Sequence, residues 1–253
     1  MLKITRLYLN NPLRNYNYLI VDTLNQTAVS VDPLDKNLIL ETLKKENLKL
    51  EAVILTHEHG DHYRDAKPLA ELTNTQIYAH YSNQNDLPKM DIALKDNDVL
   101  TFSDILTFKV IETPGHIKGH ICFYIQTDEI PRLITGDTLF NAGVGNCRHH
   151  SASVEQLYDS IKKIKQLPKE TLIYPSHDYI QTNLKFALTQ EKDNQDAQNL
   201  LEKVNKQTSE TREITNLETE FLINPFLRLN DLKQDNETKI DTFRRLRALR
   251  DQF

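Results

Sequence analysis

Apolar residues that alternate with polar ones, or form short continuous runs, dominate the N-terminal part of the chain and predict β-strands. Residues 2–9 alternate, and residues 16–21 and 28–31 are rich in β-branched and aromatic side chains. Residues 52–55, Ala-Val-Ile-Leu, form a continuous apolar run that is typical of a buried strand. Further strands are predicted at residues 76–80, 108–113, 121–125, 133–135 and 172–174.

Helical spacing of apolar residues occurs between these strands and then takes over toward the C-terminal end. Residues 38–48 and 65–72 have the spacing of amphipathic helices. Residues 153–167 form a third predicted helix, with Ser at its N-cap, Gln three residues on and Pro just beyond its end. Residues 184–206 contain Leu, Ala, Glu, Lys and Gln without Gly or Pro, and residues 242–250 predict a closing helix.

The change from strand-rich to helical composition near residue 177 predicts a domain boundary. The first domain, residues 1–176, carries the predicted strands, and the second, residues 177–253, is small and helical. A chain of 253 residues is long enough to bury a full core without disulfides.

Charge and cysteine content exclude several classes of function. The formal net charge is −5, which argues against a general nucleic-acid binder. No apolar run is long enough for a transmembrane helix, and the first residues lack the apolar stretch of a secretory signal. Two cysteines, Cys122 and Cys147, do not make a disulfide framework. We therefore expect a cytoplasmic monomer that acts on a small molecule and binds neither nucleic acid nor membrane.

The strongest chemical signal is the sequence Thr-His-Glu-His-Gly-Asp-His at residues 56–62, directly after a predicted buried strand. His57 and His59 are separated by one residue, so their imidazoles point the same way in an extended segment. Asp61 and His62 follow a glycine and can face a second centre. An isolated His is more often structural, but this cluster of metal-ligand types favours a site that holds two metal ions.

Three later strands also end in turns that carry a His or an Asp. His116 lies in Pro-Gly-His, Asp137 in Gly-Asp-Thr and His177 in Pro-Ser-His. Strand ends that carry ligands can converge on one edge of a core, where loops hold functional residues. The predicted metal ligands are His57, His59, Asp61, His62, His116, Asp137 and His177.

This order of motifs resembles the metallo-β-lactamase superfamily. The C-terminal segments His-Asp-Tyr at 177–179, Asn-Leu-Lys-Phe-Ala at 183–187 and Asn-Pro-Phe-Leu-Arg at 224–228 are similar to glyoxalase II, the hydroxyacylglutathione hydrolase family. The likeness covers essentially the whole chain. It implies an α+β fold, a four-layer αββα sandwich followed by a small all-α C-terminal domain.

The resemblance also implies a binuclear metal site and divides the ligands between its two ions. Zn is the first expectation, with Fe or Mn as alternatives, because the same ligands accept all three. Asp61 and Asp137 are the catalytic carboxylates in this scheme. The first ion takes His57, His59 and His116, the second takes Asp61, His62 and His177, and Asp137 bridges them.

A thioester suits such a site. Two metal ions roughly 3.5–4 Å apart lower the pKa of a shared water to near neutrality. A thiolate leaves easily because the pKa of its conjugate acid is only about 8.5. Cys147 is interpreted as a packing residue, since no base is assigned to it. The resemblance implies hydrolysis of S-D-lactoylglutathione, or a related hydroxyacylglutathione, to glutathione and a 2-hydroxy acid, a reaction of methylglyoxal detoxification.

Five residues are predicted to bind the glutathione moiety. Arg247 and Arg250 are three residues apart and share a helix face, where the family places an Arg-x-x-Lys pair that holds the glycine carboxylate. Tyr179 matches a family tyrosine that helps to bind the glutathione moiety. The loop after Asp-Thr departs from the family, because Asn146 and Arg148 stand where a cation and an aromatic residue are usual. This departure concerns the substrate rather than the reaction.

Three alternatives remain open at this stage. The site could hydrolyse another thioester or a lactone, or could oxidise glutathione persulfide as a mononuclear iron oxygenase. The complete second-ion ligand set argues against the oxygenase. A purely structural zinc site is a third possibility, but structural zinc sites are closed and usually rich in cysteine. A metal titration separates these readings, with two ions expected for the hydrolase.

Overall fold

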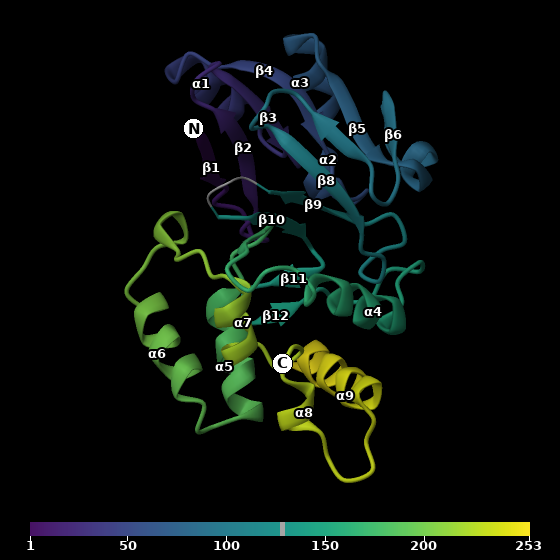
Figure 1. Ribbon diagram of the computed structural model, residues 1–253, viewed down its shortest axis with the longest axis vertical. Helices are drawn as coiled ribbons and strands as arrows, with labels where there is room; N and C mark the ends of the chain where they lie inside the picture. Colours follow the sequence, from purple (N-terminus) through teal and green to yellow (C-terminus); the bar gives the residue numbers. More distant parts are fainter. Residues whose placement is uncertain (127–129) are drawn as a thin grey trace. The chain divides into compact units, whose positions relative to one another are not determined.

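The computed structural model describes residues 1–126 and 130–253, which divide into two compact units (Figure 1). Unit 1 comprises Met1–Glu112 together with a segment that starts at Gly119. Unit 2 comprises Thr113–Lys118 and Ile130–Phe253. Each unit has strands, helices and buried apolar side chains of its own.

Unit 1 is built on a six-stranded mixed sheet. Its first three strands pair antiparallel, and the later ones pair parallel. Parallel neighbours need crossover connections, which helices α1 (Lys36–Lys45) and α3 (Ala66–Thr73) supply. In order across the sheet the strands are β1 (Leu2–Tyr8), β2 (Tyr16–Asp22), β3 (Thr27–Val31), β4 (Lys49–Ile54), β5 (Gln76–His80) and β6 (Ile92–Leu94).

The core of this unit forms where α1 and α3 pack on the sheet. Ile39 of α1 and Leu69 of α3 are fully buried with Val53 and Ile77 of the central strands. Burial of each such side chain contributes about 1.5–3 kcal/mol. The Asp35 side chain caps α1 by accepting hydrogen bonds from the backbone N–H groups of Asn37 and Leu38. The ends of β3 and β4 are therefore held rigidly.

Three further strands of unit 1 form an antiparallel ladder: β7 (Val99–Thr101), β8 (Thr107–Glu112) and β9 (Ile121–Ile125). All five residues of β9 are buried, as its apolar, β-branched sequence predicts. Two short helices complete the unit, α2 (Gly60–Tyr63) and the 3-10 helix η1 (Tyr81–Asn85).

Unit 2 begins with a parallel pair of strands, β10 (Arg132–Gly136) and β13 (Leu172–Pro175). The crossover between them is α4 (Val154–Ile164), whose N-cap Ser153 accepts from the Gln156 N–H as the sequence predicts. A two-stranded hairpin follows β10 and consists of β11 (Leu139–Phe140) and β12 (Gly143–Val144). The parallel register places the residues after β10 and β13 at the same edge.

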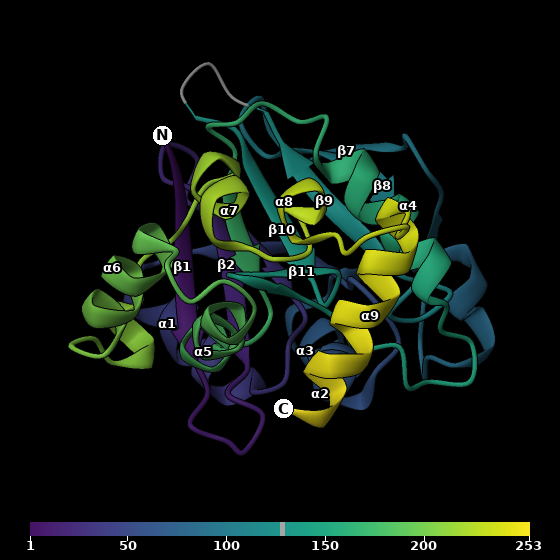
Figure 2. The same cartoon turned by 90° about the horizontal axis from the view of Figure 1, so that it is seen from below.

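The rest of unit 2 is helical. Helices α5 (Ile180–Gln190) and α6 (Gln195–Val204) pack together, and α9 (Lys239–Gln252) packs on α4, where the Tyr158 and Phe243 rings are 5.5 Å apart (Figure 2). The short helices are η2 (Ser209–Thr211), α7 (Leu217–Ile223) and α8 (Leu229–Leu232). No helix in the described part of the chain has both the length and the apolar character needed to cross a membrane.

Most predicted elements are present, with one clear difference. Residues 76–80 and 121–125 are strands with the predicted bounds. The helical stretch predicted over residues 184–206 is instead two helices, and the first starts earlier, at Ile180. The break occurs because the Asn194 side chain caps α6 and accepts from the Ala197 N–H at 2.9 Å.

Candidate metal centre and substrate cavity

The His-rich loop after β4 brings its imidazoles together within unit 1. His57 Nε2 lies 3.0 Å from His59 Nδ1, so the two side chains point the same way as predicted from their spacing. The ring centroids of His57 and His62 are 4.0 Å apart. His120 also stacks on His57, with ring centroids 5.0 Å apart.

Asp32 orients two of these imidazoles, although its only signal in the sequence is its position at the end of a predicted strand. Its carboxylate accepts from the Thr56 N–H at 2.8 Å, the Thr56 hydroxyl at 2.7 Å and His62 Nδ1 at 3.0 Å. Since the Thr56 hydroxyl gives its proton to Asp32, it accepts from His57 Nδ1 at 2.9 Å. Both imidazoles therefore present Nε2 as the ligand atom.

Asp61 is also held by a side chain from the sheet. The buried Asn15 donates from Nδ2 to Asp61 Oδ2 at 3.0 Å and to the Asp61 backbone carbonyl at 3.3 Å. His62 Nε2 lies 3.4 Å from the same Asp61 oxygen. The Asp61 carboxylate and the His62 imidazole thus face each other on one side of the loop.

His116 sits in a fixed turn of unit 2. Its Nδ1 donates to the Asn146 carbonyl at 2.8 Å, which leaves Nε2 as the ligand atom. The preceding Gly115 has φ of 139°, and a Cβ there would lie 2.2 Å from the Leu157 nitrogen. Only glycine fits this close approach of the loop to α4.

Asp137 follows β10 and lies between two imidazoles of the same unit. One carboxylate oxygen is 3.5 Å from His116 Nε2, and the other is 3.3 Å from His177 Nε2. A carboxylate that faces two imidazoles with different oxygens has the geometry of a bridging ligand. The side chain is nearly buried, so it stays in this arrangement.

His177 follows β13 and is packed between aromatic rings. Tyr179 stacks on it in parallel, with ring centroids 4.9 Å apart, and Phe140 meets it edge-on at 5.9 Å. The next residue, Asp178, is buried and forms an ion pair with Arg212, whose Nε is 3.0 Å from Asp178 Oδ2. These contacts fix the turn that presents His177.

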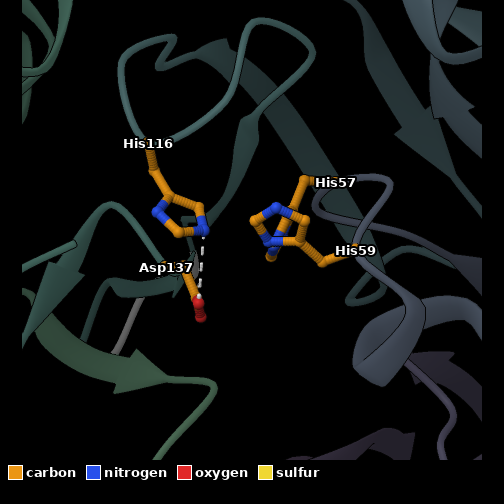
Figure 3. A group of neighbouring side chains, drawn as sticks. All are labelled: His57, His59, His116 and Asp137. Atoms are coloured by element: carbon orange, nitrogen blue, oxygen red, sulfur yellow. Dashed lines mark hydrogen bonds and ion pairs between the residues drawn. The ribbon is translucent and has the colours of Figure 1, made fainter. Parts of the chain in front are cut away.

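The ligand-type side chains fall into two groups. The first group comprises His57, His59, His116 and Asp137. The second group comprises Asp61, His62 and His177. Within each group, the possible ligand atoms lie within 4.8 Å of one another. Figure 3 draws the first group, with a dashed line from His116 Nε2 to Asp137 Oδ2.

The donors of these groups fit divalent metal ions. They are imidazole nitrogens and carboxylate oxygens without a thiolate, a set that suits Zn, Fe or Mn. Imidazole N–H groups that donate to a carboxylate or a carbonyl are the usual support of metal-ligating His, and His62 and His116 both have one. The described residues therefore fit a divalent metal site.

A cavity of about 140 Å³ lies within unit 2 and is lined by all five residues predicted to bind substrate. Phe140 and Tyr179 form its wall on the side of His177. Sequence reasoning missed Asn183 and Asp251, which are polar parts of the same wall. The lining residues are Phe140, Val144, Asn146, Arg148, Tyr179, Asn183, Arg247, Arg250 and Asp251.

The three arginines of this cavity differ in how they are held. Arg250 is half-buried, and its Nε and Nη2 donate to Asn183 Oδ1 at 3.2 and 3.1 Å. Arg148 is exposed and donates to the Asp251 carbonyl at 2.9 Å. Arg247 is only 4% exposed, and its Nη atoms bond to the protein itself. Burial lowers the pKa of Arg247 and of Arg250, although both stay cationic.

Cys147 lies in the loop next to the cavity but is a poor nucleophile. Burial raises the pKa of its thiol to about 11, with a smaller opposing effect of Arg247. Nucleophilic cysteines instead have a lowered pKa and an electropositive, accessible setting.

Comparisons with known proteins agree with this geometry. The Metallo-beta-lactamase superfamily profile matches residues 17–177, and the Hydroxyacylglutathione hydrolase C-terminus profile matches residues 178–253. A protein of Myxococcus xanthus described as ETHE1 has a crystal structure similar to this one, with TM-score 0.72, 25% identity, and coverage of 98% of this chain and 91% of that one. The fold and the His/Asp cluster define a metal-binding protein of the metallo-β-lactamase superfamily.

Within that superfamily, curated relatives narrow the assignment. A hydroxyacylglutathione hydrolase of Francisella tularensis subsp. novicida is 38% identical over 100% of both chains. A protein of the same name from Francisella philomiragia is 40% identical over 90% of this chain and 88% of its own. The chain belongs to the hydroxyacylglutathione hydrolase family. The resemblance noted from the sequence is confirmed, as is the α+β fold with an all-helical C-terminal region.

Proposed function

We propose that this protein hydrolyses the thioester of S-D-lactoylglutathione, or of a closely related hydroxyacylglutathione, at a centre of two divalent metal ions. The products are glutathione and a 2-hydroxy acid. The observation that carries the proposal is the pairing of a seven-residue His/Asp donor set with an arginine-lined cavity beside His177. The relatives named hydroxyacylglutathione hydrolase support the same activity.

The two ligand groups are proposed to act as one binuclear centre. Zn is the expected metal, with Fe or Mn as alternatives that availability decides. His57, His59 and His116 would hold one ion, and Asp61, His62 and His177 would hold the other. Asp137, which has one oxygen near His116 and the other near His177, would serve both. When bound, the ions supply Lewis acidity toward the carbonyl and lower the pKa of water to near neutrality.

Neighbouring residues set the orientation of the proposed metal-ligating side chains. Asp32 and the Asn146 carbonyl fix the Nδ1 protons of His62 and His116, so Nε2 of each ring faces the ion. Asn15 holds the Asp61 carboxylate through Nδ2. Catalytic geometry is thereby set before substrate binds, which is the main source of electrostatic catalysis.

The cavity is proposed to bind the glutathione moiety. Arg250 and Arg148 offer guanidinium groups to its carboxylates, and such charge-assisted bonds fix orientation as well as affinity. The Tyr179 ring and the Asn146 amide line the cavity beside these two arginines. Because Tyr179 also stacks on His177, a thiol bound in the cavity lies beside a ligand of the centre. The departing thiolate needs little help from an acid, since the pKa of a thiol is about 8.5.

These roles assign metal binding and substrate binding largely to different parts of the chain. We assign residues 1–176 to a catalytic domain and residues 177–253 to a helical substrate-binding domain. The two free cysteines and the thiol substrate support a reducing, cytoplasmic compartment. A monomer is the proposed state, and its elution volume in size-exclusion chromatography checks it.

Hydrolysis of two matched thioesters tests the proposed substrate. The first is S-D-lactoylglutathione, and the second is a D-lactoyl thioester of a small neutral thiol without carboxylates. Fast turnover of the first alone is expected, because only it can use the arginines of the cavity. Equal kcat/KM for the two would keep the thioesterase but remove glutathione as the specific thiol. No turnover of either by protein with two bound metals would overturn the proposal and direct attention to lactones.

A further inference from the structure

Arg247 belongs to the lining of the cavity, but its guanidinium is buried against the loop of residues 144–146. Only 4% of it is exposed. Its Nη1 donates to the backbone carbonyls of Val144 and Gly145 at 2.9 and 3.0 Å, and its Nη2 donates to Asp251 Oδ1 at 3.0 Å. The Phe226 ring lies beneath the guanidinium, with its centroid 5.5 Å away. Both Nη atoms are thus engaged within the protein.

The loop that Arg247 holds makes direct contact with His116. Asn146, the residue after Gly145, accepts the Nδ1 proton of His116 on its backbone carbonyl at 2.8 Å. The position of that carbonyl depends on the backbone just before it, where the two acceptors of Arg247 lie. A shift of the loop would therefore turn the His116 ring.

The same loop packs against Asp137. A Cβ on Gly145 would lie 2.0 Å from the Asp137 carbonyl oxygen and 3.2 Å from His116 Cβ, so the backbone there touches both residues. The Gly145 N–H donates to the Thr138 carbonyl at 3.2 Å. Residues 144–146 therefore contact His116, Asp137 and the guanidinium of Arg247.

We infer that Arg247 is a positioning residue for the metal centre, which clamps residues 144–146 so that His116 and Asp137 keep their ligand geometry. The C-terminal helix α9 thereby supports the metal site as well as the substrate cavity. Arg250, one turn further on, donates instead to Asn183 Oδ1 through its Nε and Nη2. Arg250 and Arg148 are then the cations that face the substrate.

This inference rests on the metal centre of the proposed function but not on its substrate. Residues that hold a ligating His usually change metal affinity or activity by about 10- to 100-fold when they are replaced. Arg247→Ala should weaken the binding of Zn²⁺ to the substrate-free protein by about that factor. A residue that only grips a substrate carboxylate would raise KM and leave metal affinity unchanged.

The experiment measures the Kd for Zn²⁺ by competition with a chromophoric chelator, in full-length protein without substrate. Arg247→Ala and Arg247→Lys are compared with Arg250→Ala, which lines the same cavity, and with Arg244→Ala on the exposed side of α9. The lysine variant keeps the charge but lacks the planar fork that reaches two carbonyls. Weaker Zn²⁺ binding in both Arg247 variants, with the wild-type Kd in the other two, is the expected result.

A second measurement keeps the inference testable if one of the variants fails to fold. Circular dichroism identifies such a variant, and Arg247→Lys carries the test if Arg247→Ala is unfolded. The visible spectrum of the Co²⁺-substituted protein reports ligand geometry and should change in Arg247→Lys but not in Arg250→Ala. The inference would be overturned if the Arg247 variants kept the wild-type Zn²⁺ affinity and Co²⁺ spectrum while their KM rose tenfold. Arg247 would then be a substrate-binding residue. A wild-type protein that binds Zn²⁺ but hydrolyses no thioester would refute the substrate alone.

Discussion

At the scale of single residues, the proposed metal ligands are oriented by side chains outside the proposed ligand set. The Asp32 carboxylate accepts three hydrogen bonds. It orients the His62 imidazole directly and the His57 imidazole through the Thr56 hydroxyl. Asn15 holds Asp61, and Asn183 holds Arg250. The chemistry of the site is therefore shared between ligands and the residues that orient them.

Asp32→Asn tests this support directly. The amide has one acceptor oxygen instead of two, so it cannot accept all three of the hydrogen bonds from Thr56 and His62, and its NH₂ group faces a former donor. Metal affinity should fall by about 10- to 100-fold, with a parallel loss of kcat/KM. Atomic absorption after dialysis against a weak chelator measures the loss. Asp35→Asn is the matched control, because Asn replaces Asp well at a helix N-cap and α1 is capped by Asp35. Full metal content in Asp32→Asn would refute the orienting role.

Arg250 tests the substrate cavity at the same scale. Its guanidinium is held by Asn183 and lines the cavity, so it is placed to meet a carboxylate. A hydrogen bond to a charged group contributes about 1.5–3 kcal/mol. Arg250→Ala should raise KM for S-D-lactoylglutathione by about 10- to 100-fold with little change in kcat. Steady-state kinetics measure both constants. The same change in KM for a thioester without carboxylates would show that the cavity does not bind the glutathione.

At the scale of elements, ligands lie where pairs of parallel strands end. Val31 of β3 is paired with Ile54 of β4, so Asp32 meets Thr56 just beyond the ladder. In unit 2, Gly136 of β10 is paired with Pro175 of β13, and Asp137 and His177 follow. Parallel register therefore converts ligands that are distant in sequence into neighbours.

The loop after β12 provides a prediction at this scale. Gly145→Ala would place a Cβ 2.0 Å from the Asp137 carbonyl oxygen, so the loop must move. We expect the free energy of unfolding to fall by about 1–3 kcal/mol, together with weaker metal binding. Gly60→Ala, in the His-rich loop of unit 1, is the matched control, since no atom lies within 4 Å of a Cβ at that position. Urea unfolding and metal content measure both effects, and equal behaviour of the two variants would contradict the packing argument.

Helix α7 gives a pH prediction. Its Glu220 is fully buried and accepts from the Ala142 N–H, the Thr215 hydroxyl and Asn224 Nδ2, which ties α7 to the β11–β12 hairpin. Burial raises the pKa of this carboxyl above its ordinary value of 4.5, against the lowering effect of its hydrogen bonds. A raised pKa in the folded state gives stability that is complete below the unfolded value and is lost as pH rises through the folded value.

The free energy of unfolding of the wild type should therefore fall, relative to that of Glu220→Gln, as pH rises from 4.5 toward neutrality. Gln keeps the volume but does not ionise, so the difference between the two proteins isolates the carboxyl. Urea denaturation of both metal-free proteins at several pH values measures it. A difference that does not change with pH would mean that Glu220 does not titrate differently on folding.

At the scale of the whole molecule, the sequence predicts the site better than it predicts the parts that support it. The two groups of ligand-type His and Asp could be predicted because these residues recur at strand ends, where a buried strand gives a rigid base. Asp32 and Asn183 could not be, because each acts on a residue far along the chain. The break between α5 and α6 depends on one side-chain cap, and the burial of Arg247 depends on packing that no helical periodicity encodes. Long-range contacts of this kind carry no local pattern.

The most direct measurement is a metal titration of the metal-free protein, with the rate of S-D-lactoylglutathione hydrolysis followed at each addition. We predict no rate without metal and a rise that reaches its plateau at two equivalents, because the seven ligands form two groups. A full rate without metal, or no rate when two equivalents are bound, would contradict the proposal of a binuclear thioester hydrolase.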